Sequence, residues 1–220
     1  MKRILIASLL LMLTARLYAQ ETFNPLNGFR LGLTAYPTIG WVKPDVGKSN
    51  GISLGFAYGL LADFNFAENY SFATGLTIST INGKNTQIIS TGTSPVTQTP
   101  YELKYKLQYI EVPLTVKLKT TKMGDVRWYG QFGLSNDFNI SAKQDAEVSG
   151  QSVSKDEKIS DNIKFYRGGL IIGGGGEFDL SGNTSIAAGL TYNNGFTDIL
   201  SDKNASARNH YIGINFGVFF

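Results

Sequence analysis

Residues 51–66 alternate strictly between two kinds of side chain. In GISLGFAYGLLADFNF every even position from Ile52 to Phe66 is apolar, and most of the odd positions hold Gly, Ser, Asp or Asn. A period of two is the signature of a β-strand, because successive side chains point to opposite faces of the sheet. The stretch is also longer than the five or six residues usual in globular sheets. The chain is therefore expected to form long strands with one apolar face.

Seven further segments carry the same alternation, which brings the expected number of strands to eight. They cover residues 28–40, 70–81, 103–119, 126–140, 163–180, 184–193 and 209–220. An even number of strands is what an up-and-down barrel with both chain ends on one side requires. The sequence therefore predicts an all-β fold, an eight-stranded antiparallel up-and-down transmembrane barrel.

Short and long connections alternate along the chain. Tight turns are predicted at 67–69, 120–125 and 181–183, and long polar loops at 41–50, 82–102, 142–162 and 194–208. Short turns on one side and long loops on the other are typical of an outer-membrane barrel, with the short turns facing the periplasm. No Pro-rich or Ser-rich linker divides residues 20–220, so a single barrel domain is expected.

The alternation alone does not decide which face lies inside. A soluble barrel would turn its apolar face inward, and a membrane barrel would turn it toward lipid. The opposite face is small or polar, and its charged residues are Arg30, Asp63, Glu111, Lys117, Arg127, Asp137, Arg167 and Glu177. The bulk of the apolar face favours the membrane barrel, so these charges are expected inside.

Aromatic residues near the strand ends also favour a membrane barrel. One group is predicted at the periplasmic level: Phe29, Phe64, Phe66, Tyr70, Phe72, Trp128, Phe178 and Phe220. The other is predicted near the outer level: Trp41, Tyr105, Phe138, Tyr166 and Tyr192. Two such girdles match the interfacial belts of a barrel that spans a bilayer.

The N-terminus predicts a secretory signal peptide over residues 1–19. Lys2 and Arg3 precede an apolar run, Ile4 to Leu13, which is too short to span a membrane as a helix. Cleavage would also remove Arg16 and leave 17 of the 20 basic residues against 17 acidic ones. The mature chain would be formally neutral, which gives no support to nucleic-acid binding.

The chain ends on a strand whose alternate residues are Ile, Phe and Val. Phe216 and Phe220 would lie against lipid, and the backbone edge of this strand would pair with the first strand to close the barrel. Such an ending resembles the C-terminal strand that the outer-membrane assembly machinery reads. That machinery and the lipid of the outer membrane are therefore expected partners.

The segment 103–119 breaks the pattern. Its apolar residues occupy odd positions as far as Tyr109 and even positions from Ile110 onward. A one-residue slip would turn every following side chain to the other face, so the sequence requires either a bulge or a stretch that protrudes beyond the membrane. Pro113 cannot donate a hydrogen bond to a neighbouring strand, which fits an irregularity here.

Four stretches together resemble the PorT-like outer-membrane β-barrel family of Bacteroidota. They are YIEVPLTVKLK (109–119), VRWYGQFGL (126–134), RGGLIIGGGGEFDL (167–180) and GLTYNNGFTDIL (189–200). The Tyr-x-Glu-x-Pro element is the most specific of them, and the resemblance covers nearly all of the mature chain. It implies an eight-stranded barrel in the outer membrane and, for PorT itself, a part in type IX protein secretion. It implies no active site.

The inward charges predict a polar network that fills the lumen. The residues expected in it are Arg30, Asp63, Glu111, Lys117, Arg127, Asp137 and Glu177. The interior of an eight-stranded barrel is just wide enough to be filled by side chains, and charges removed from water need partners. A small-solute channel lined by the same residues is the alternative.

A hydrolase at the outer rim is a second alternative. His210 is the only histidine, and Asp198, Asp202 and Ser206 precede it. A lone histidine in a loop is more often a solvated bystander than a general base, so no enzyme is expected. Without Cys and with one His, neither a metal nor a cofactor is predicted. The polar segment 143–162 offers a docking surface for a protein partner, and a structural or scaffolding role is predicted.

Overall fold

The structure is a computed structural model of the chain, and it describes residues 28–45, 48–49, 51–91, 97–181, 184–202 and 205–220. The predicted signal peptide, residues 1–19, lies outside the described residues. The strands are β1 Phe29–Pro44, β2 Lys48–Ser49, β3 Ser53–Ala67, β4 Tyr70–Thr91, β5 Thr97–Lys119, β6 Val126–Val148, β7 Gln151–Lys158, β8 Tyr166–Ser181, β9 Thr184–Gly195 and β10 Ala207–Phe219. A short 3-10 helix, η3, covers Ser160–Asn162. Within these ranges no helix is long and apolar enough to cross a membrane.

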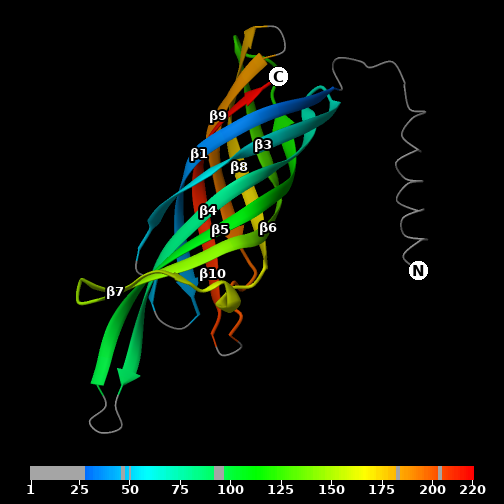
Figure 1. Cartoon of the computed structure of the whole chain (residues 1–220). Coiled ribbons are helices and arrows are strands. Elements are labelled where there is room, and N and C mark those ends of the chain that lie inside the picture. Colours follow the sequence, from blue (N-terminus) through cyan, green and yellow to red (C-terminus); the bar gives the residue numbers. More distant parts are fainter. Residues whose placement is uncertain (1–27, 46–47, 50, 92–96, 182–183, 203–204) are drawn as a thin grey trace, which may run out of the picture.

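Eight strands form a closed antiparallel ring (Figure 1). Around the ring they follow the order β1, β3, β4, β5, β6, β8, β9 and β10, and β10 pairs back with β1. In the closing ladder Phe219 stands opposite Gly32, and the N–H of Phe220 donates to the carbonyl of Leu31 at 2.8 Å. Every spanning strand thus has two neighbours, which hydrocarbon requires because it holds no water to satisfy a free edge. The predicted eight-stranded barrel is confirmed.

The two faces of the ring differ in chemistry. Outward side chains such as Leu60 and Leu76 are more than half exposed on the bare protein, whereas the inward Asp63 and Glu177 are each 2% exposed. An apolar outside and a polar inside are the arrangement of a barrel surrounded by lipid rather than by water.

Aromatic side chains ring the outer surface at two levels. All eight predicted at the periplasmic level are exposed on the barrel surface, and Phe29 and Phe64 form one ring pair with centroids 4.9 Å apart. At the outer level Trp41 stacks on Tyr192 and Phe138 contacts Tyr166. Tyr105 is the exception, because its side chain faces inward and is buried, so its predicted place in the outer girdle is wrong.

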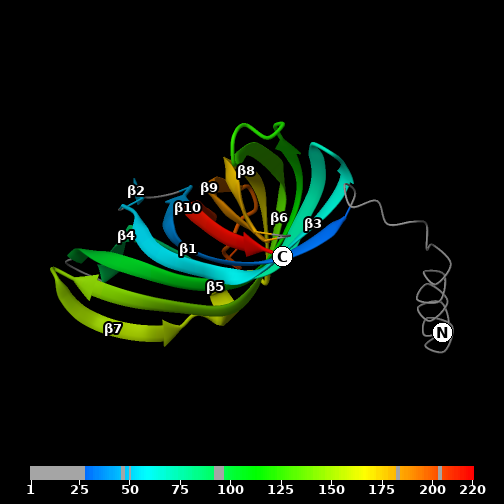
Figure 2. The ribbon, with the colours of Figure 1, turned by 90° about the horizontal axis from the view of Figure 1, so that it is seen from above.

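The prediction of long loops at 82–102 and 142–162 is also wrong. β4 continues to Thr91 and pairs with β5 from Thr97 onward, so most of the first segment is a hairpin. β6 continues to Val148 and pairs with the additional strand β7. In Figure 1 these strands run on together past the end of the ring, and Figure 2 shows them lying to one side of it. We call the extended parts of β4, β5 and β6, together with β7, the protruding sheet.

The change of pattern in β5 is explained by this protrusion and not by a slip. Odd residues of β5 face inward along its whole described length, from Leu103 to Lys119. The register shift lies on the neighbouring strand, because Gln108 pairs with Ser141 and Tyr109 with Asn139. Ile140 is therefore an extra residue in β6, and it marks the level at which the protruding sheet begins.

Above that level the distribution of apolar residues is reversed. Leu103, Tyr105 and Leu107 face inward and are buried, whereas the outward positions of β5 hold Glu102, Lys104 and Lys106. Water replaces lipid around this part of the sheet, so a polar outside and an apolar inside become favourable. Three loop residues, Ile159, Ile163 and Ile199, complete this small apolar core.

Candidate functional site

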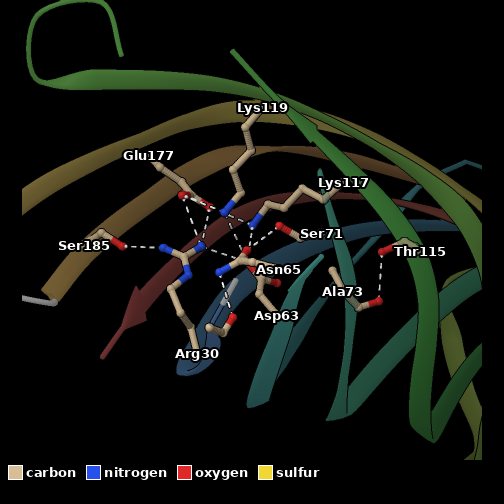
Figure 3. Close-up of polar contacts among 11 residues, drawn as sticks. Arg30, Asp63, Asn65, Ser71, Ala73, Thr115, Lys117, Lys119, Glu177 and Ser185 are labelled. Atoms are coloured by element: carbon tan, nitrogen blue, oxygen red, sulfur yellow. Dashed lines mark hydrogen bonds and ion pairs between the residues drawn. The ribbon is translucent and has the colours of Figure 1, made fainter. Parts of the chain in front are cut away.

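Five charged side chains meet inside the barrel near the end that carries the short turns. We call Arg30, Asp63, Lys117, Lys119 and Glu177 the periplasmic cluster. They come from β1, β3, β5 and β8, strands that stand on different sides of the ring, and each occupies an inward position of its strand (Figure 3). All except Arg30 are buried. The cluster therefore ties the ring together across its lumen.

Two carboxylates share three cations in this cluster. Glu177 lies 2.8 Å from Lys117 Nζ, 3.1 Å from Arg30 Nη2 and 3.3 Å from Lys119 Nζ. Asp63 lies 2.8 Å from the same guanidinium nitrogen of Arg30 and 3.1 Å from Lys117 Nζ. Burying a charge is costly unless an opposite charge and hydrogen bonds replace water, and each carboxylate here has both.

Two of the cations in this cluster also lie over aromatic rings. Arg30 Cζ lies 4.7 Å from the centre of the Phe219 ring, and Lys117 Nζ lies 4.8 Å from the same centre. The ring of Tyr129 lies 4.6 Å from Lys117 Nζ on another side. The negative face of an aromatic ring attracts a cation, and more strongly where the cation is buried, as Lys117 is.

A second cluster lies farther toward the outer end. We call Glu111, Asp137, Arg167, Asn193, Asn209 and Tyr211 the outer cluster. The strand register assembles it, because Glu111 stands opposite Asp137 and Asp137 stands opposite Arg167. Three charged residues of β5, β6 and β8 thus occupy one row across the inner wall.

Arg167 is the centre of the outer cluster. Its side chain is fully buried and forms an ion pair with Asp137. The guanidinium also donates to the Asn193 side chain at 3.0 Å and to the backbone carbonyl of Asn209 at 2.9 Å. The Tyr211 hydroxyl donates to Glu111 at 2.7 Å. The outer cluster therefore connects polar side chains from five strands of the barrel.

The two clusters enclose a small cavity of about 80 Å³. Glu111 and Tyr211 line it on one side, and Lys117 and Phe219 line it on the other. Such a volume has room for a few water molecules, and its walls are mostly apolar, with polar groups from Glu111, Lys117 and Tyr211. The lumen is thus filled by side chains above and below a small cavity, as the narrow interior of an eight-stranded ring requires.

The connection between β9 and β10 folds over the outer end of the lumen, where Asp198 fastens it. One Asp198 oxygen accepts hydrogen bonds from the N–H groups of Leu200 and Ala207 at 3.1 and 2.9 Å. The other lies 2.6 Å from Lys164 Nζ. Partial burial raises the pKa of Asp198, but the hydrogen bonds from Lys164, Ala207 and Leu200 outweigh it, so that the pKa lies below its usual value.

Acidification is therefore expected to loosen this connection. A carboxyl whose pKa is lowered by folding adds stability above its unfolded pKa of about 3.9, and the contribution is lost as the pH falls toward the folded value. The protection of the Leu200 and Ala207 amides against hydrogen exchange, measured relative to the intrinsic rate at each pH, should fall below about pH 4. Asp198→Asn should already speed exchange several-fold at neutral pH, equal to about 1 kcal/mol for this partly exposed group. Asp161→Asn, in the exposed η3 turn, is the matched control, and equal effects of both changes would contradict the assignment.

The structure distributes the seven residues predicted for the lumen network over three places. Arg30, Asp63, Lys117 and Glu177 meet in the periplasmic cluster, and Glu111 and Asp137 meet in the outer cluster. Arg127 joins neither. It stands opposite Glu177 in the strand register but forms no ion pair with any residue that the structure describes, because Glu177 is bonded to cations across the lumen.

Three further residues take part in the lumen contacts, although they were not among the seven residues predicted for that network. Lys119 and Arg167 share the inward parity of their strands, so the alternation contained the signal for both. Phe219 is the third, and it faces the lumen beneath two cations. Phe216 and Phe220, which flank it on the opposite parity, lie on the outer surface of the closing strand. The parity of the last strand thus separates lipid-facing from lumen-facing aromatic residues.

Two of the residues considered for hydrolysis, His210 and Asp198, are engaged in other contacts. His210 stacks on Trp41 with ring centroids 5.6 Å apart, at the outer aromatic girdle. Asp198 is bonded to Lys164 and to backbone N–H groups, as described above. Across the part of the chain that the structure describes, no group of three or more His, Cys, Asp or Glu residues is placed to hold a metal ion.

The protruding sheet has a groove on its inner side. The groove has a volume of about 500 Å³ and lies between β5, β6 and β7, residues 159–163, and Leu200, Asp202 and Ala205. Its walls include Tyr101, Leu103, Tyr105 and Val153, with Gln144, Ser154 and Glu157 as polar neighbours. A cleft of this size with apolar walls and a few polar groups has the usual character of a binding surface.

Comparison with known proteins gives one family match. Residues 18–201 match the family described as "Outer membrane protein beta-barrel domain". No curated protein sequence matches the chain. Among solved structures, Neisserial surface protein A has 15% identity and a TM-score of 0.48, covering 87% of this chain and 95% of its own. OprG from Pseudomonas aeruginosa has 12% identity and a TM-score of 0.45, with coverages of 88% and 96%.

Proposed function

Because this chain belongs to the outer membrane protein beta-barrel domain family, we propose that it is a closed outer-membrane barrel that holds a binding sheet for a protein partner outside the cell. The barrel lies in the outer membrane, and its long connections face outward if the short turns are periplasmic. In this proposal the barrel is the anchor and the protruding sheet is the part that acts.

The length of three neighbouring strands is the observation that carries this proposal. β4, β5 and β6 contain 22, 23 and 23 residues, whereas β9 and β10 contain 12 and 13. About 9–11 residues suffice for a tilted strand to cross the hydrocarbon. Roughly half of each long strand therefore stands outside the membrane, where it forms its own apolar core and the groove.

Site-specific crosslinking in intact cells tests the partner surface. A photoreactive residue at Val153, which lines the groove, should form a discrete adduct with one protein, and the same residue at the lipid-facing Leu76 should not. Ser154→Trp should fill the groove and lower the adduct yield at least tenfold, equal to about 1.4 kcal/mol of binding free energy. Ser152→Trp, on the same strand but outside the groove, should leave it unchanged. An adduct that survives Ser154→Trp would contradict the proposal.

The lumen supports an anchor better than a small-solute channel. Both clusters place buried, mutually bonded side chains across the interior. The purified barrel is therefore expected to show no stepwise conductance in planar bilayers. Reproducible conductance steps that depend on folded protein would favour the channel and would contradict the proposal of a closed anchor.

Protein secretion is the finer role that we propose for the partner surface. The support is the resemblance of residues 109–119 and the stretches after it to the PorT-like family. A strain without the gene should retain proteins that the parent secretes, and the wild-type chain should restore their release while the Ser154→Trp variant should not. Unchanged secretion in the deletion strain would contradict the role in secretion but not the proposal that the protruding sheet binds a protein partner.

We propose further that the chain is not an enzyme. His210 is stacked in the aromatic girdle, and Asp198 is bonded to a lysine and two N–H groups. Hydrolysis of an ester or peptide substrate by the purified barrel that is lost in His210→Ala would overturn this.

A further inference from the structure

Two cations stand side by side on the outside of the barrel at its outer rim. Lys43 of β1 and Arg208 of β10 are direct partners in the closing ladder. Both side chains are exposed. They project outward, since the intervening Val42 and Asn209 are buried on the inner face. Directly opposed residues have Cβ atoms about 4.5–5.5 Å apart, so the two positive side chains are close neighbours.

No carboxylate within the described residues forms an ion pair with either cation. The ion pairs of the barrel involve Arg30, Lys104, Lys106, Lys117, Lys119, Lys122, Lys164 and Arg167. Neither Lys43 nor Arg208 is among them. Like charges placed directly opposite each other destabilise an antiparallel pair. An anion between them would turn that repulsion into attraction.

The position of Lys43 and Arg208 on the barrel indicates which kind of anion they meet. Two residue pairs nearer the membrane centre, on the same face, Trp41 stands opposite His210, and the Trp41 ring stacks on both His210 and Tyr192. Such a group of aromatic rings settles at the level of the lipid headgroups. Lys43 and Arg208, the next pair on the outer face of this ladder, therefore meet the charged surface of the outer leaflet.

We propose that Lys43 and Arg208 form a binding site for the phosphate of a lipid headgroup in the outer leaflet. The planar guanidinium of Arg208 can donate two parallel hydrogen bonds to phosphate oxygens, and the Lys43 ammonium adds a second positive charge. The acyl chains of the same lipid would lie along the apolar strands below, past Trp41 and Ile39. The site is independent of the protruding sheet and of any protein partner.

Fluorescence quenching by brominated lipids tests the site directly. The chain has two tryptophans, so Trp128→Phe leaves Trp41 as a single reporter beside the cation pair. The refolded chain is placed in phosphatidylcholine vesicles that contain phosphatidic acid, with bromine on the acyl chains of one lipid or the other. Phosphatidic acid should be enriched at Trp41 by about five- to thirty-fold, as one or two cations worth about 1 kcal/mol each would give. The preference should weaken in 1 M salt.

Charge-matched variants separate this site from general attraction to the surface. Lys43→Gln with Arg208→Gln should bring the preference close to one, and each single change should lower it about fivefold. Lys155→Gln with Lys158→Gln removes the same charge from the exposed strand β7 and should leave the preference intact. If the double variant does not refold, the two single variants test the same prediction.

Three results would overturn the proposal. The first is that phosphatidic acid is no more enriched at Trp41 than phosphatidylcholine in the parent chain, and the second is that its enrichment survives the loss of both cations. Soluble inorganic phosphate that abolishes the enrichment at low millimolar concentration would assign the site to free phosphate instead of lipid. Enrichment that only the Lys43 and Arg208 variants abolish, and that soluble phosphate leaves in place, supports the lipid site.

Discussion

Glu177→Gln is expected to lower the free energy of unfolding in detergent micelles by about 3–5 kcal/mol, the usual cost of breaking a buried ion pair from one side. Glu177 lies within 3.3 Å of a nitrogen of each of Lys117, Arg30 and Lys119. Its neutralisation would leave three cations facing Asp63 alone inside the barrel. Urea titration followed by tryptophan fluorescence measures the change.

A surface pair is the control for this experiment. Asp179 lies two residues along the same strand and is 2.9 Å from Lys122, with both side chains well exposed to water. Asp179→Asn should therefore cost less than about 1 kcal/mol. Pairing Glu177→Gln with Lys117→Gln should restore part of the loss, because one unpaired cation is removed with the carboxylate. Equal costs for Glu177→Gln and Asp179→Asn would show that the periplasmic cluster does not hold the ring together.

The second large effect is expected at the outer cluster. Arg167→Met should destabilise the barrel by about 3–5 kcal/mol, because it leaves the buried carboxyl groups of Asp137 and Glu111 in one row without a cation. Asn193 and Asn209 would also lose the guanidinium that satisfies their oxygens. Thermal unfolding, followed by the shift in gel mobility between folded and unfolded chain, measures the loss.

A compensating change distinguishes lost charge balance from lost packing. Adding Asp137→Asn to Arg167→Met removes one of the two stranded carboxyl groups and should recover a clear part of the stability. Arg208→Met provides a matched control, since that arginine is exposed on the outer face of the barrel. If the added Asp137→Asn makes the barrel weaker still, the electrostatic account of the outer cluster is wrong.

The strands of the barrel could be predicted from the sequence because lipid on one side and a polar lumen on the other impose a strict period of two. The alternation from Ile52 to Phe66 is such a case, and β3 covers nearly all of it. The long loops at 82–102 and 142–162 were predicted wrongly because their residues are polar. A polar sequence in water can still be a strand when its inner face is apolar, as Leu103, Tyr105 and Leu107 show.

The lumen contacts could be predicted only as a set of inward charges. Parity places Lys117 and Glu177 on the inside, but it does not state which charges meet. The pairing depends on the stagger between strands and on side-chain reach across the lumen. Arg127 illustrates the limit, because it stands opposite Glu177 in the register and yet forms no ion pair among the described residues. The assembly of Glu111, Asp137 and Arg167 in one row likewise follows from the register of three strands.

The reversal at Ile140 also determines how deep the molecule sits in the bilayer. Movement toward the cell interior by two residues would carry Lys106 and its bonded partner Asp145 toward hydrocarbon. Movement the other way would lift the apolar residues next to Ile110 into water. Both displacements raise the free energy, so the barrel cannot slide along its own axis. The groove is thereby kept at a constant height above the lipid.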